Sequence, residues 1–340
     1  MDKKKPLLLI TGMCGRIGCE VAAMFSQDFH VVGLDICTPP VPYEGVDYFF
    51  TDVSSLENVK DSLRQVREKY GSHIASFIHL AAYYNFEGGK WEKYQKITIE
   101  GTANLLEALK DFELDQFVFS STLLVYAPCR LGEKIDENSL VDPKWEYPLS
   151  KIKTEEIIKA NRGNASSVIL RIAGIYDDGC HSIPISQHIA RIYEKKLESH
   201  FFPGNVDQGA TFLHMDDLMR ALKIIVEKRK ELKPEELFVL GEGEVLNFGQ
   251  LQDEIGRLLH GKTWWTMRIP KWVAKCGAAV KKSFIKPWMV DLADDHYEVD
   301  TQKARAVLGW EPTHSLKNCL SKMVDALKQN PKKWYQEHEI

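Results

Sequence analysis

The sequence lacks the features of small stapled, membrane-spanning or nucleic-acid-binding proteins. Its 340 residues include seven cysteines, with no C-x-x-C pair, so neither a disulfide framework nor a zinc site is indicated. No run approaches the roughly 18 apolar residues of a membrane-spanning helix. Lys and Arg number 44 against 48 Asp and Glu, which leaves no positive excess for a nucleic-acid backbone. We therefore expect a cytoplasmic protein that holds no metal, binds no nucleic acid and has no membrane span.

The first half of the chain alternates short apolar runs with longer amphipathic ones. The predicted strands are Leu7–Thr11, His30–Asp35, Asp47–Thr51, Ser76–Leu80, Gln116–Ser121 and Ser167–Ile172, and the predicted helices are 16–27, 55–69, 91–111 and 149–161. This alternation is typical of an α/β protein with a doubly wound parallel sheet. In such a sheet a ligand lies beyond the carboxyl ends of the strands, so functional residues should follow the strands directly.

After residue 173 the alternation decays, and proline, glycine and tryptophan become frequent. We assign residues 1–172, with roughly 210–242, to a cofactor-binding domain. Residues 173–209 and 243–340 are assigned to a smaller substrate-binding domain, because 340 residues exceed the usual size of one core. Within it, the run 272–282 (WVAKCGAAVKK) has a short apolar stripe and a basic end, and we expect it to be a packed helix rather than a membrane-surface segment.

A glycine-rich turn follows the first predicted strand. It contains Gly12, Gly15 and Gly18, and a helical run comes after it. Glycines at this spacing let backbone N–H groups approach a pyrophosphate at a helix N-terminus. Asp35 ends the second strand 17 positions after Gly18 and can accept both ribose hydroxyls, which favours NAD over NADP, although Arg16 argues mildly the other way. The turn therefore predicts a Rossmann-like domain that binds NAD.

Further motifs lie at the ends of the later strands and beyond them. They are Asp52-Val53, 79–82 (HLAA), 119–126 (FSSTLLVY), 147–151 (YPLSK), 211–217 (TFLHMDD) and 300–312 (DTQKARAVLGWEP). With the glycine-rich turn, these stretches resemble the extended short-chain dehydrogenase/reductase family of NAD-dependent epimerases and dehydratases. Some likeness extends to its 3β-hydroxysteroid dehydrogenase branch.

The resemblance, together with the glycine-rich turn, identifies candidate site residues. The predicted cofactor-binding residues are Gly12, Met13, Cys14, Gly15, Arg16, Ile17, Gly18, Asp35, Asp52, Val53, Leu80, Ala81, Ala82, Tyr147, Lys151 and Ile172. The predicted substrate-binding residues are Tyr83, Thr122 and Gly174. The resemblance also implies a possible homodimer through the helices 91–111 and 149–161.

Tyr147, Lys151 and Thr122 are the predicted catalytic residues. Tyr147 and Lys151 are four positions apart on one helix face, which brings their Cβ atoms to about 5–6 Å. An ammonium group and an oxidised nicotinamide nearby favour the phenolate of tyrosine, so Tyr147 can act as a proton shuttle. Thr122 can hold the same substrate oxygen. These residues predict an oxidoreductase that interconverts a secondary alcohol and a ketone.

Several positions depart from the pattern of the sugar-nucleotide epimerases in that family. Gly174 stands in place of a substrate-binding Asn, Ala210 replaces an arginine that holds a diphosphate, and 291–296 lacks the later R-x-G-D arginine. Without the two arginines and the asparagine, the contacts that hold a diphosphate sugar are missing, and a typical UDP-sugar is not the expected substrate. Leu123 and Leu124 replace the Asp-Glu pair of the 4,6-dehydratases, which argues against dehydration, and Thr98 in place of Asn is interpreted as tuning the proton relay.

Aromatic side chains near the predicted site indicate an apolar pocket that suits a small or alicyclic alcohol or ketone. Tyr83, Tyr84 and Phe86 follow the fourth strand, and the tryptophans 264, 265, 272 and 288 either join them or form core and domain interface. His79 and His214 are interpreted as structural. Two alternatives stay open: a nucleotide-sugar epimerase with internally recycled NAD, and a non-catalytic NAD-binding sensor or scaffold.

Overall fold

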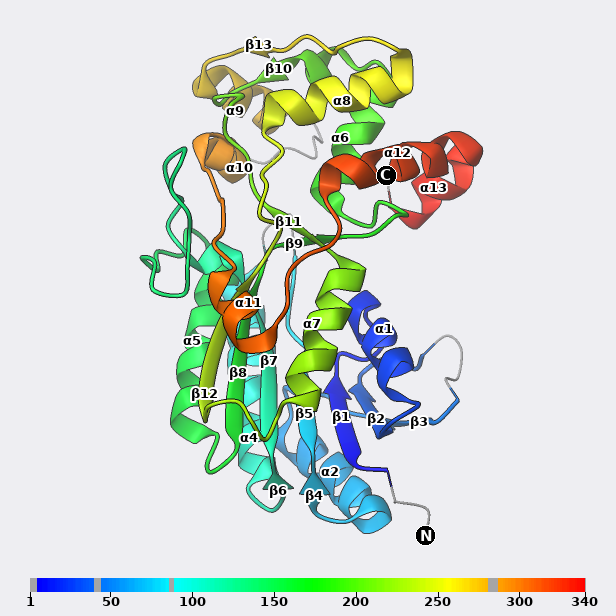
Figure 1. The fold of residues 1–340 in the computed structure, drawn as a ribbon, viewed down its shortest axis with the longest axis vertical. Helices are drawn as coiled ribbons and strands as arrows, with labels where there is room; N and C mark the ends of the chain where they lie inside the picture. The colour runs from blue at the N-terminus through cyan, green and yellow to red at the C-terminus, as the bar shows by residue number, and fades with distance from the viewer. Residues whose placement is uncertain (1–4, 40–43, 86–88, 281–286, 340) are drawn as a thin grey trace.

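A seven-stranded, wholly parallel sheet runs through one part of the molecule (Figure 1). The computed structural model describes residues 5–39, 44–85, 89–280 and 287–339. In spatial order the strands are β12 (Glu235–Leu240), β8 (Ser166–Ile172), β7 (Gln116–Thr122), β5 (Ser76–His79), β1 (Leu7–Thr11), β2 (His30–Asp35) and β3 (Val46–Phe50). The order reverses at β1, as in a doubly wound fold, and this confirms the predicted Rossmann-like α/β class.

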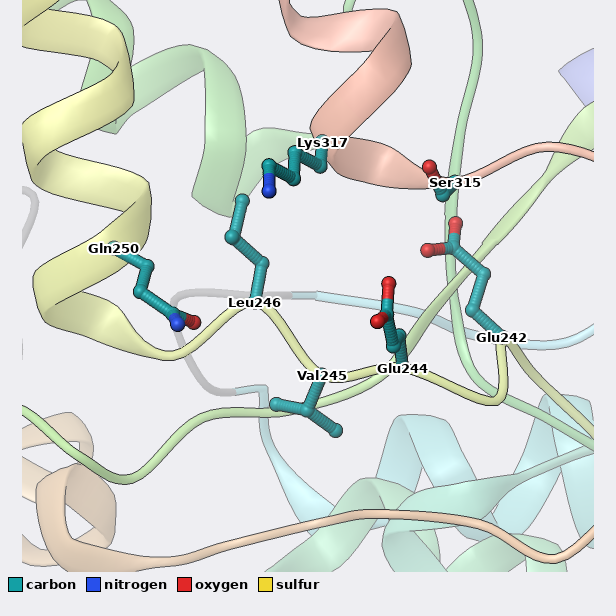
Figure 2. A pocket seen from close by; sticks show the side chains of 7 residues that line it. All are labelled: Glu242, Glu244, Val245, Leu246, Gln250, Ser315 and Lys317. Atoms are coloured by element: carbon teal, nitrogen blue, oxygen red, sulfur yellow. The ribbon is translucent and has the colours of Figure 1, made fainter.

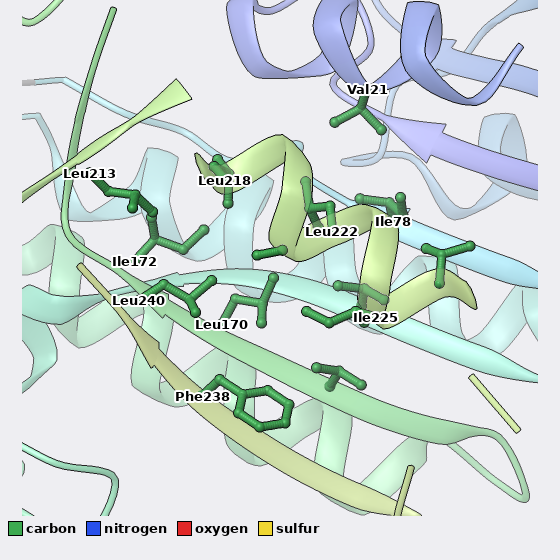
Figure 3. Close-up of a cluster of buried hydrophobic side chains, with 14 of the residues drawn as sticks. Val21, Ile78, Leu170, Ile172, Leu213, Leu218, Leu222, Ile225, Phe238 and Leu240 are labelled. Atoms are coloured by element: carbon green, nitrogen blue, oxygen red, sulfur yellow. The ribbon is translucent and has the colours of Figure 1, made fainter. Parts of the chain in front are cut away.

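Helices cover both faces of the sheet, which explains why its central strands are apolar on both sides. The helices that pack beside it, with the π-helix η1 and the 3-10 helix η2, are α1 (Arg16–Phe25), α2 (Leu56–Tyr70), α3 (Trp91–Lys93), η1 (Tyr94–Glu100), α4 (Gly101–Leu109), η2 (Leu123–Val125), α5 (Glu146–Asn161), α7 (Met215–Glu227) and α11 (Gln302–Leu308). One buried core contains residues of α1 and α7, and a second contains residues of α2, α4 and α5. In Figure 3 the α7 side chains Leu218, Leu222 and Ile225 lie over Leu170 and Phe238 of the sheet.

A third core lies beyond the carboxyl end of the sheet and holds the smaller part of the molecule together. The helices of the smaller part, including the 3-10 helices η3 and η4, are α6 (Ile183–Tyr193), η3 (Leu197–His200), α8 (Phe248–His260), α9 (Lys271–Val280), α10 (Pro287–Asp291), η4 (Leu292–Asp294), α12 (Leu316–Gln329) and α13 (Pro331–Glu337). Short strand pairs complete the fold: β9 (Gly174–Tyr176) with β11 (Phe212–His214), β10 (Phe201–Phe202) with β13 (Met267–Arg268), and β4 (His73–Ile74) with β6 (Glu113–Leu114).

One segment assigned by sequence to the second domain packs with the sheet instead. Ala304 and Leu308 of α11, together with Trp310, are buried in the core that α1 and α7 share. The indole N–H of Trp310 donates to the backbone oxygen of Asp217 at 2.9 Å, which ties this segment to α7. The chain therefore returns to the sheet between residues 297 and 310 before α12 rejoins the third core.

Two predicted helices differ from the observed ones. The helix predicted over 91–111 is interrupted by the π-helix η1, where Thr98 uses its Oγ1 to accept the backbone N–H of Tyr83 at 2.9 Å. The helix predicted from residue 149 begins at Glu146, because Pro148 is tolerated in a first turn whose N–H groups have no helical partner. Among the described residues, no helix combines the length and apolar character needed to cross a bilayer.

Candidate active site

The glycine-rich turn between β1 and α1 is packed so closely that side chains would not fit. Gly12 has a positive φ of 71°, and a Cβ atom there would lie 2.8 Å from the backbone nitrogen of Ala81. At Gly18 a Cβ atom would lie 2.2 Å from the carbonyl oxygen of Gly12. Gly15 is the N-cap of α1 and makes no side-chain cap, so the first N–H groups of the helix are left for a ligand. A pyrophosphate fits this cradle.

Asp35 stands at the end of β2 beside the same turn. Its carboxylate accepts the backbone N–H of Cys14 at 2.9 Å and that of Cys37 at 3.1 Å, so each oxygen keeps capacity for a further donor. Arg16 pairs instead with Asp177 of the smaller part, at 3.1 Å. The guanidinium that would attract a 2′-phosphate is therefore already partnered, and the residues fit NAD.

The other predicted cofactor residues lie along the same edge of the sheet. Met13 is fully buried against Gly33, where a Cβ atom would be 2.1 Å from its sulfur, so it anchors the turn. Asp52 accepts the N–H of Ser54 at 2.9 Å, and its neighbour Val53 is buried. The remaining predicted residues at this edge are Ile17 in α1, Leu80, Ala81 and Ala82 directly after β5, and Ile172 at the end of β8.

A hydrogen-bonded chain with one consistent direction fixes the turn after β5. The N–H of Ala81 donates to Thr11 Oγ1 at 3.2 Å, which lies 2.6 Å from His79 Nδ1. On the other side, His79 Nε2 lies 2.8 Å from Thr102 Oγ1, which donates to the carbonyl of Thr98 at 2.6 Å. Burial lowers the pKa of His79 to about 3, so the ring is neutral. His79 has the structural role that the sequence indicated.

Tyr147 occupies the first turn of α5. Its ring packs edge-on against Tyr84, with ring centres 4.9 Å apart. Burial and the neighbouring Tyr84 raise the pKa of Tyr147, and a hydrogen bond with Thr122 acts in the opposite direction. The phenol therefore holds its proton at neutral pH and can donate it to a developing alkoxide.

Lys151 lies one turn further along α5 and is buried. Its Nζ donates to the carbonyl oxygen of Ser120 at 2.7 Å and lies 5.8 Å from the centre of the Tyr147 ring. Burial lowers the pKa of Lys151 to about 7, while the carboxylate of Glu155 acts in the opposite direction. The ammonium form next to Tyr147 is thus sensitive to pH in the neutral range.

A buried ion pair behind these residues was not predicted. Arg171 of β8 binds Glu155 of α5 through two contacts, Nε at 3.2 Å and Nη2 at 2.7 Å, and Ser121 Oγ donates to the same carboxylate. The guanidinium also lies 4.6 Å from the centre of the Tyr126 ring. Two sequence signals could have found the pair: Glu155 follows Lys151 by four positions, and Arg171 interrupts an apolar strand.

Of the predicted substrate residues, Thr122 lies beside Tyr147, whereas the ring of Tyr83 packs against Tyr94. Thr122 ends β7, and its Oγ1 accepts the N–H of Leu124 at 3.3 Å. Tyr83 turns toward Tyr94, with ring centres 4.8 Å apart, so Tyr84 is the aromatic residue that faces Tyr147. Gly174 is exposed and lies beside Phe212, where a Cβ atom would be 3.0 Å from the ring and would require the ring to shift slightly.

The tryptophans divide between core and surface. Trp264 is buried and donates its indole N–H to Ser199 Oγ at 2.9 Å, whereas Trp265 and Trp272 are exposed. Phe86 and the side chain of Trp288 lie outside the described residues.

Two further clusters of titratable side chains contain none of the predicted cofactor-binding or catalytic residues. Asp178, His214 and Cys319 come within ligand distance of one another. However, His214 Nδ1 accepts the N–H of Asp216 at 3.1 Å, which places the ring proton on Nε2, and Asp178 pairs with Lys322 at 2.8 Å. These contacts do not prepare the cluster for a cation.

The second cluster consists of Glu242, Glu244 and Lys317 and belongs to a pocket of about 110 Å³ (Figure 2). The other lining residues of this pocket are Val245, Leu246, Gln250 and Ser315. Burial raises the pKa of Glu242 to about 7, and its carboxylate accepts the N–H of Leu316 at 2.8 Å. The lining shares no residue with the predicted cofactor or catalytic set.

The parallel sheet and the glycine-rich turn at its carboxyl edge define a dinucleotide-binding protein of the Rossmann-like class. The sequence profile of the NAD dependent epimerase/dehydratase family matches residues 8–241, and the chain belongs to this family. The predicted family and an NAD-dependent enzyme are thereby confirmed. The roles of individual site residues stay predictions.

Relatives with full-length similarity include both reductases and epimerases. The chain is 24% identical over 341 residues to dTDP-4-dehydro-6-deoxyglucose reductase of Escherichia coli, covering 96% of this chain and 99% of that protein. It is 25% identical over 343 residues to UDP-glucuronate 4-epimerase of Thermodesulfobacterium geofontis, covering 95% and 96%. The solved structure of UDP-glucuronic acid 4-epimerase from Bacillus cereus, in complex with UDP-glucuronic acid and NAD, matches with a TM-score of 0.72 at 22% identity, covering 95% of this chain and 99% of that one.

Proposed function

We propose that the protein interconverts a secondary alcohol and a ketone with NAD as the hydride carrier. The observation that carries the proposal is the meeting of Thr122, Tyr147 and Lys151 at the carboxyl ends of the strands, beside the glycine-rich turn. In a doubly wound sheet this edge is where a ligand binds.

Each of the three side chains has a distinct task in this proposal. Tyr147 gives its phenolic proton to the carbonyl oxygen during reduction and takes a proton from the hydroxyl during oxidation. Thr122 holds that oxygen in place through its hydroxyl. Lys151, in its ammonium form, favours the phenolate and so assists the oxidation direction. NAD, with its pyrophosphate held by the cradle of Gly12, Gly15 and Gly18, would accept or return the hydride at its nicotinamide ring.

We infer a substrate without a typical uridine diphosphate group. Ala210 and Gly174 offer no charged or amide group, so the bidentate contacts that hold a diphosphate are missing at these positions. Near Tyr147 the surroundings are aromatic and aliphatic, with Tyr84 on one side and Leu123 buried at the end of β7. A small or alicyclic alcohol or ketone suits such a wall.

A nucleotide-sugar epimerase is the second candidate function. Two relatives with full-length similarity, a reductase and an epimerase, are both named for nucleotide-sugar substrates, and the epimerase favours this alternative. An epimerase would return the hydride to the other face of the ketone and release no reduced cofactor. A non-catalytic NAD sensor is less supported, because a retired site has no physical need for Thr122, Tyr147 and Lys151 together.

The decisive experiment is a screen of the purified protein with NAD and NADH against secondary alcohols, ketones and nucleotide sugars. Net formation of NADH from a simple alcohol, with none from UDP-sugars, supports the proposal. Conversion of a UDP-sugar to its epimer without free NADH would replace it with the second candidate. Binding of NAD without turnover of any compound would favour the sensor. A homodimer through η1, α4 and α5 stays a prediction, which light scattering can test.

A further inference from the structure

The smaller part of the molecule exposes large apolar side chains within one short segment. Trp265 is 56% exposed, Met267 49%, Trp272 70% and Val273 37%, all within nine residues. We call these four side chains, with the exposed Arg268 between them, the tryptophan surface. It lies on β13, the start of α9 and the loops beside them, at one end of the long axis of the molecule (Figure 1). Large exposed apolar side chains grouped in one short segment indicate a site of interaction.

On α9 the exposed side carries apolar side chains, which is the reverse of an ordinary surface helix. Trp272, Val273 and Cys276 are exposed, and positions i, i+1 and i+4 share one side of a helix. The sequence pattern had suggested a packed helix, in which Trp272 and Val273 would be covered. The solvent-facing side of α9 is instead its apolar side.

The lysines of α9 are held away from that side by ion pairs. Lys271 Nζ lies 2.8 Å from the carboxylate of Asp294, and Lys275 Nζ lies 2.6 Å from that of Asp291. Lys271 also donates to the backbone oxygen of Asp291 at 2.9 Å. These contacts join α9 to α10 and η4 on the side away from Trp272.

Trp265 is also held in place. Its indole stacks on the imidazole of His200, with ring centres 3.8 Å apart and an angle of 10° between the planes. The backbone oxygen of Trp265 lies 2.8 Å from His200 Nδ1. A half-exposed tryptophan that is stacked in this way is already ordered and loses little conformational freedom when it binds.

Two exposed basic side chains accompany the tryptophan surface, although the whole chain has a formal charge of −4. Residues 261–280 contain four basic residues and no Asp or Glu, but Lys271 and Lys275 are paired with Asp294 and Asp291 of the following segment. Lys262 and Arg268 are exposed. Exposed tryptophan with neighbouring basic residues is the combination that binds at the headgroup level of an anionic bilayer.

We propose that the tryptophan surface docks the protein reversibly on a bilayer that contains anionic lipids. A second copy of this chain is a poorer occupant, because a two-fold contact would place the same surface of both copies together, with the exposed basic side chains of each facing the other. A bilayer supplies both an apolar layer for Trp265 and Trp272 and negative headgroups for the basic side chains. The proposal does not depend on the substrate or on the reaction.

Co-sedimentation of the full chain with vesicles tests the proposal. We expect binding to mixed phosphatidylcholine–phosphatidylserine vesicles that is about tenfold tighter than to phosphatidylcholine alone and weakens with salt. The double variant W265S/W272S should lose at least about tenfold in binding, and K262E/R268E should lose the preference for phosphatidylserine. Leu140→Ser, at a side chain 73% exposed on another segment, is the matched control and should bind like the unmodified chain.

NAD binding by each variant, measured by calorimetry, shows that the fold is retained. The proposal is overturned if the unmodified chain does not sediment with anionic vesicles, or if W265S/W272S sediments as well as it does. Lipid-free dimers that W265S/W272S abolishes would assign the surface to a second copy. Single-stranded DNA binding lost in the same variant, without vesicle binding, would assign it to nucleic acid.

Discussion

The glycine-rich turn and the predicted substrate positions offer different kinds of contact to a ligand. At the turn, the cradle is formed by backbone atoms, and contacts as short as 2.2 Å would arise if Gly18 carried a Cβ atom. At the predicted substrate positions, contacts would come from side chains on separate segments, and Ala210 and Gly174 supply none of the expected polar groups. Backbone recognition leaves glycine spacings in the sequence, whereas side-chain recognition leaves no local pattern. The cofactor is therefore readable from the sequence and the substrate is not.

The largest expected effect is the loss of turnover in Tyr147→Phe. Removing the only atom of this side chain that carries a proton for transfer should lower kcat by about 10²–10⁴-fold. NAD affinity, measured by calorimetry, should change little because the cradle is intact. The control is Tyr84→Phe, whose ring still packs on Tyr147. Full activity in Tyr147→Phe would remove the residue from the mechanism.

Breaking the ion pair behind the site should have the next largest effect. Glu155→Gln leaves Arg171 charged and buried, which should cost about 3 kcal/mol in the free energy of unfolding. Because the Glu155 carboxylate favours the ammonium form of Lys151, its loss should also lower the pKa of Lys151 further. The high-pH limb of the rate profile should then move to lower pH.

The matched control for that experiment is Glu156→Gln, at an exposed position on the same helix. Chemical denaturation and a pH series of kcat would be measured for both variants. An unshifted profile in Glu155→Gln would show that the pair acts on stability alone.

A third experiment compares glycines in the two parts directly. Gly18→Ala places a Cβ atom against the carbonyl of Gly12 and should weaken NAD binding by at least about tenfold. Gly243→Ala, in the loop after β12, meets no atom within 4 Å and should leave NAD binding unchanged. Equal NAD affinity in the two variants would mean that the turn is not the cofactor cradle.

The smallest expected effect is a gain of binding at position 210. Ala210→Arg supplies a guanidinium where the family resemblance places one, and should tighten binding of uridine diphosphate by a few-fold, within about tenfold. Ala210→Met adds similar length without charge and serves as the control. If the unmodified chain already binds uridine diphosphate as tightly as Ala210→Arg, the inference of a substrate without that group is wrong.

Much of the sheet could be predicted because its local signals agree with its environment. The bounds of β1 and β2 match the predicted ones, since apolar runs buried on both faces end at glycine or acidic residues. The π-helix η1 was not predicted, and the contact that Thr98 within it makes with the backbone of Tyr83, in a different segment, has no local signal in the sequence.

The site was predicted where spacing within one element carries the information, as for Tyr147 and Lys151 on α5. It was missed where the partner comes from another element. The pairing of Glu155 with Arg171 depends on α5 lying beside β8, and the ion pairs of Lys271 and Lys275 join α9 to acidic residues of the segment after it. A single sequence does not encode such pairings locally.

Hydride transfer between substrate and NAD at the edge that holds Tyr147 can be followed with one labelled substrate. The NAD-loaded protein is incubated with an active alcohol that is deuterated at its carbinol carbon, and deuterium in the nicotinamide is measured by mass spectrometry. We expect deuterium in the cofactor with the unmodified chain and a large reduction with Tyr147→Phe. Turnover of the substrate without deuterium ever reaching the cofactor would show that NAD is not the hydride carrier.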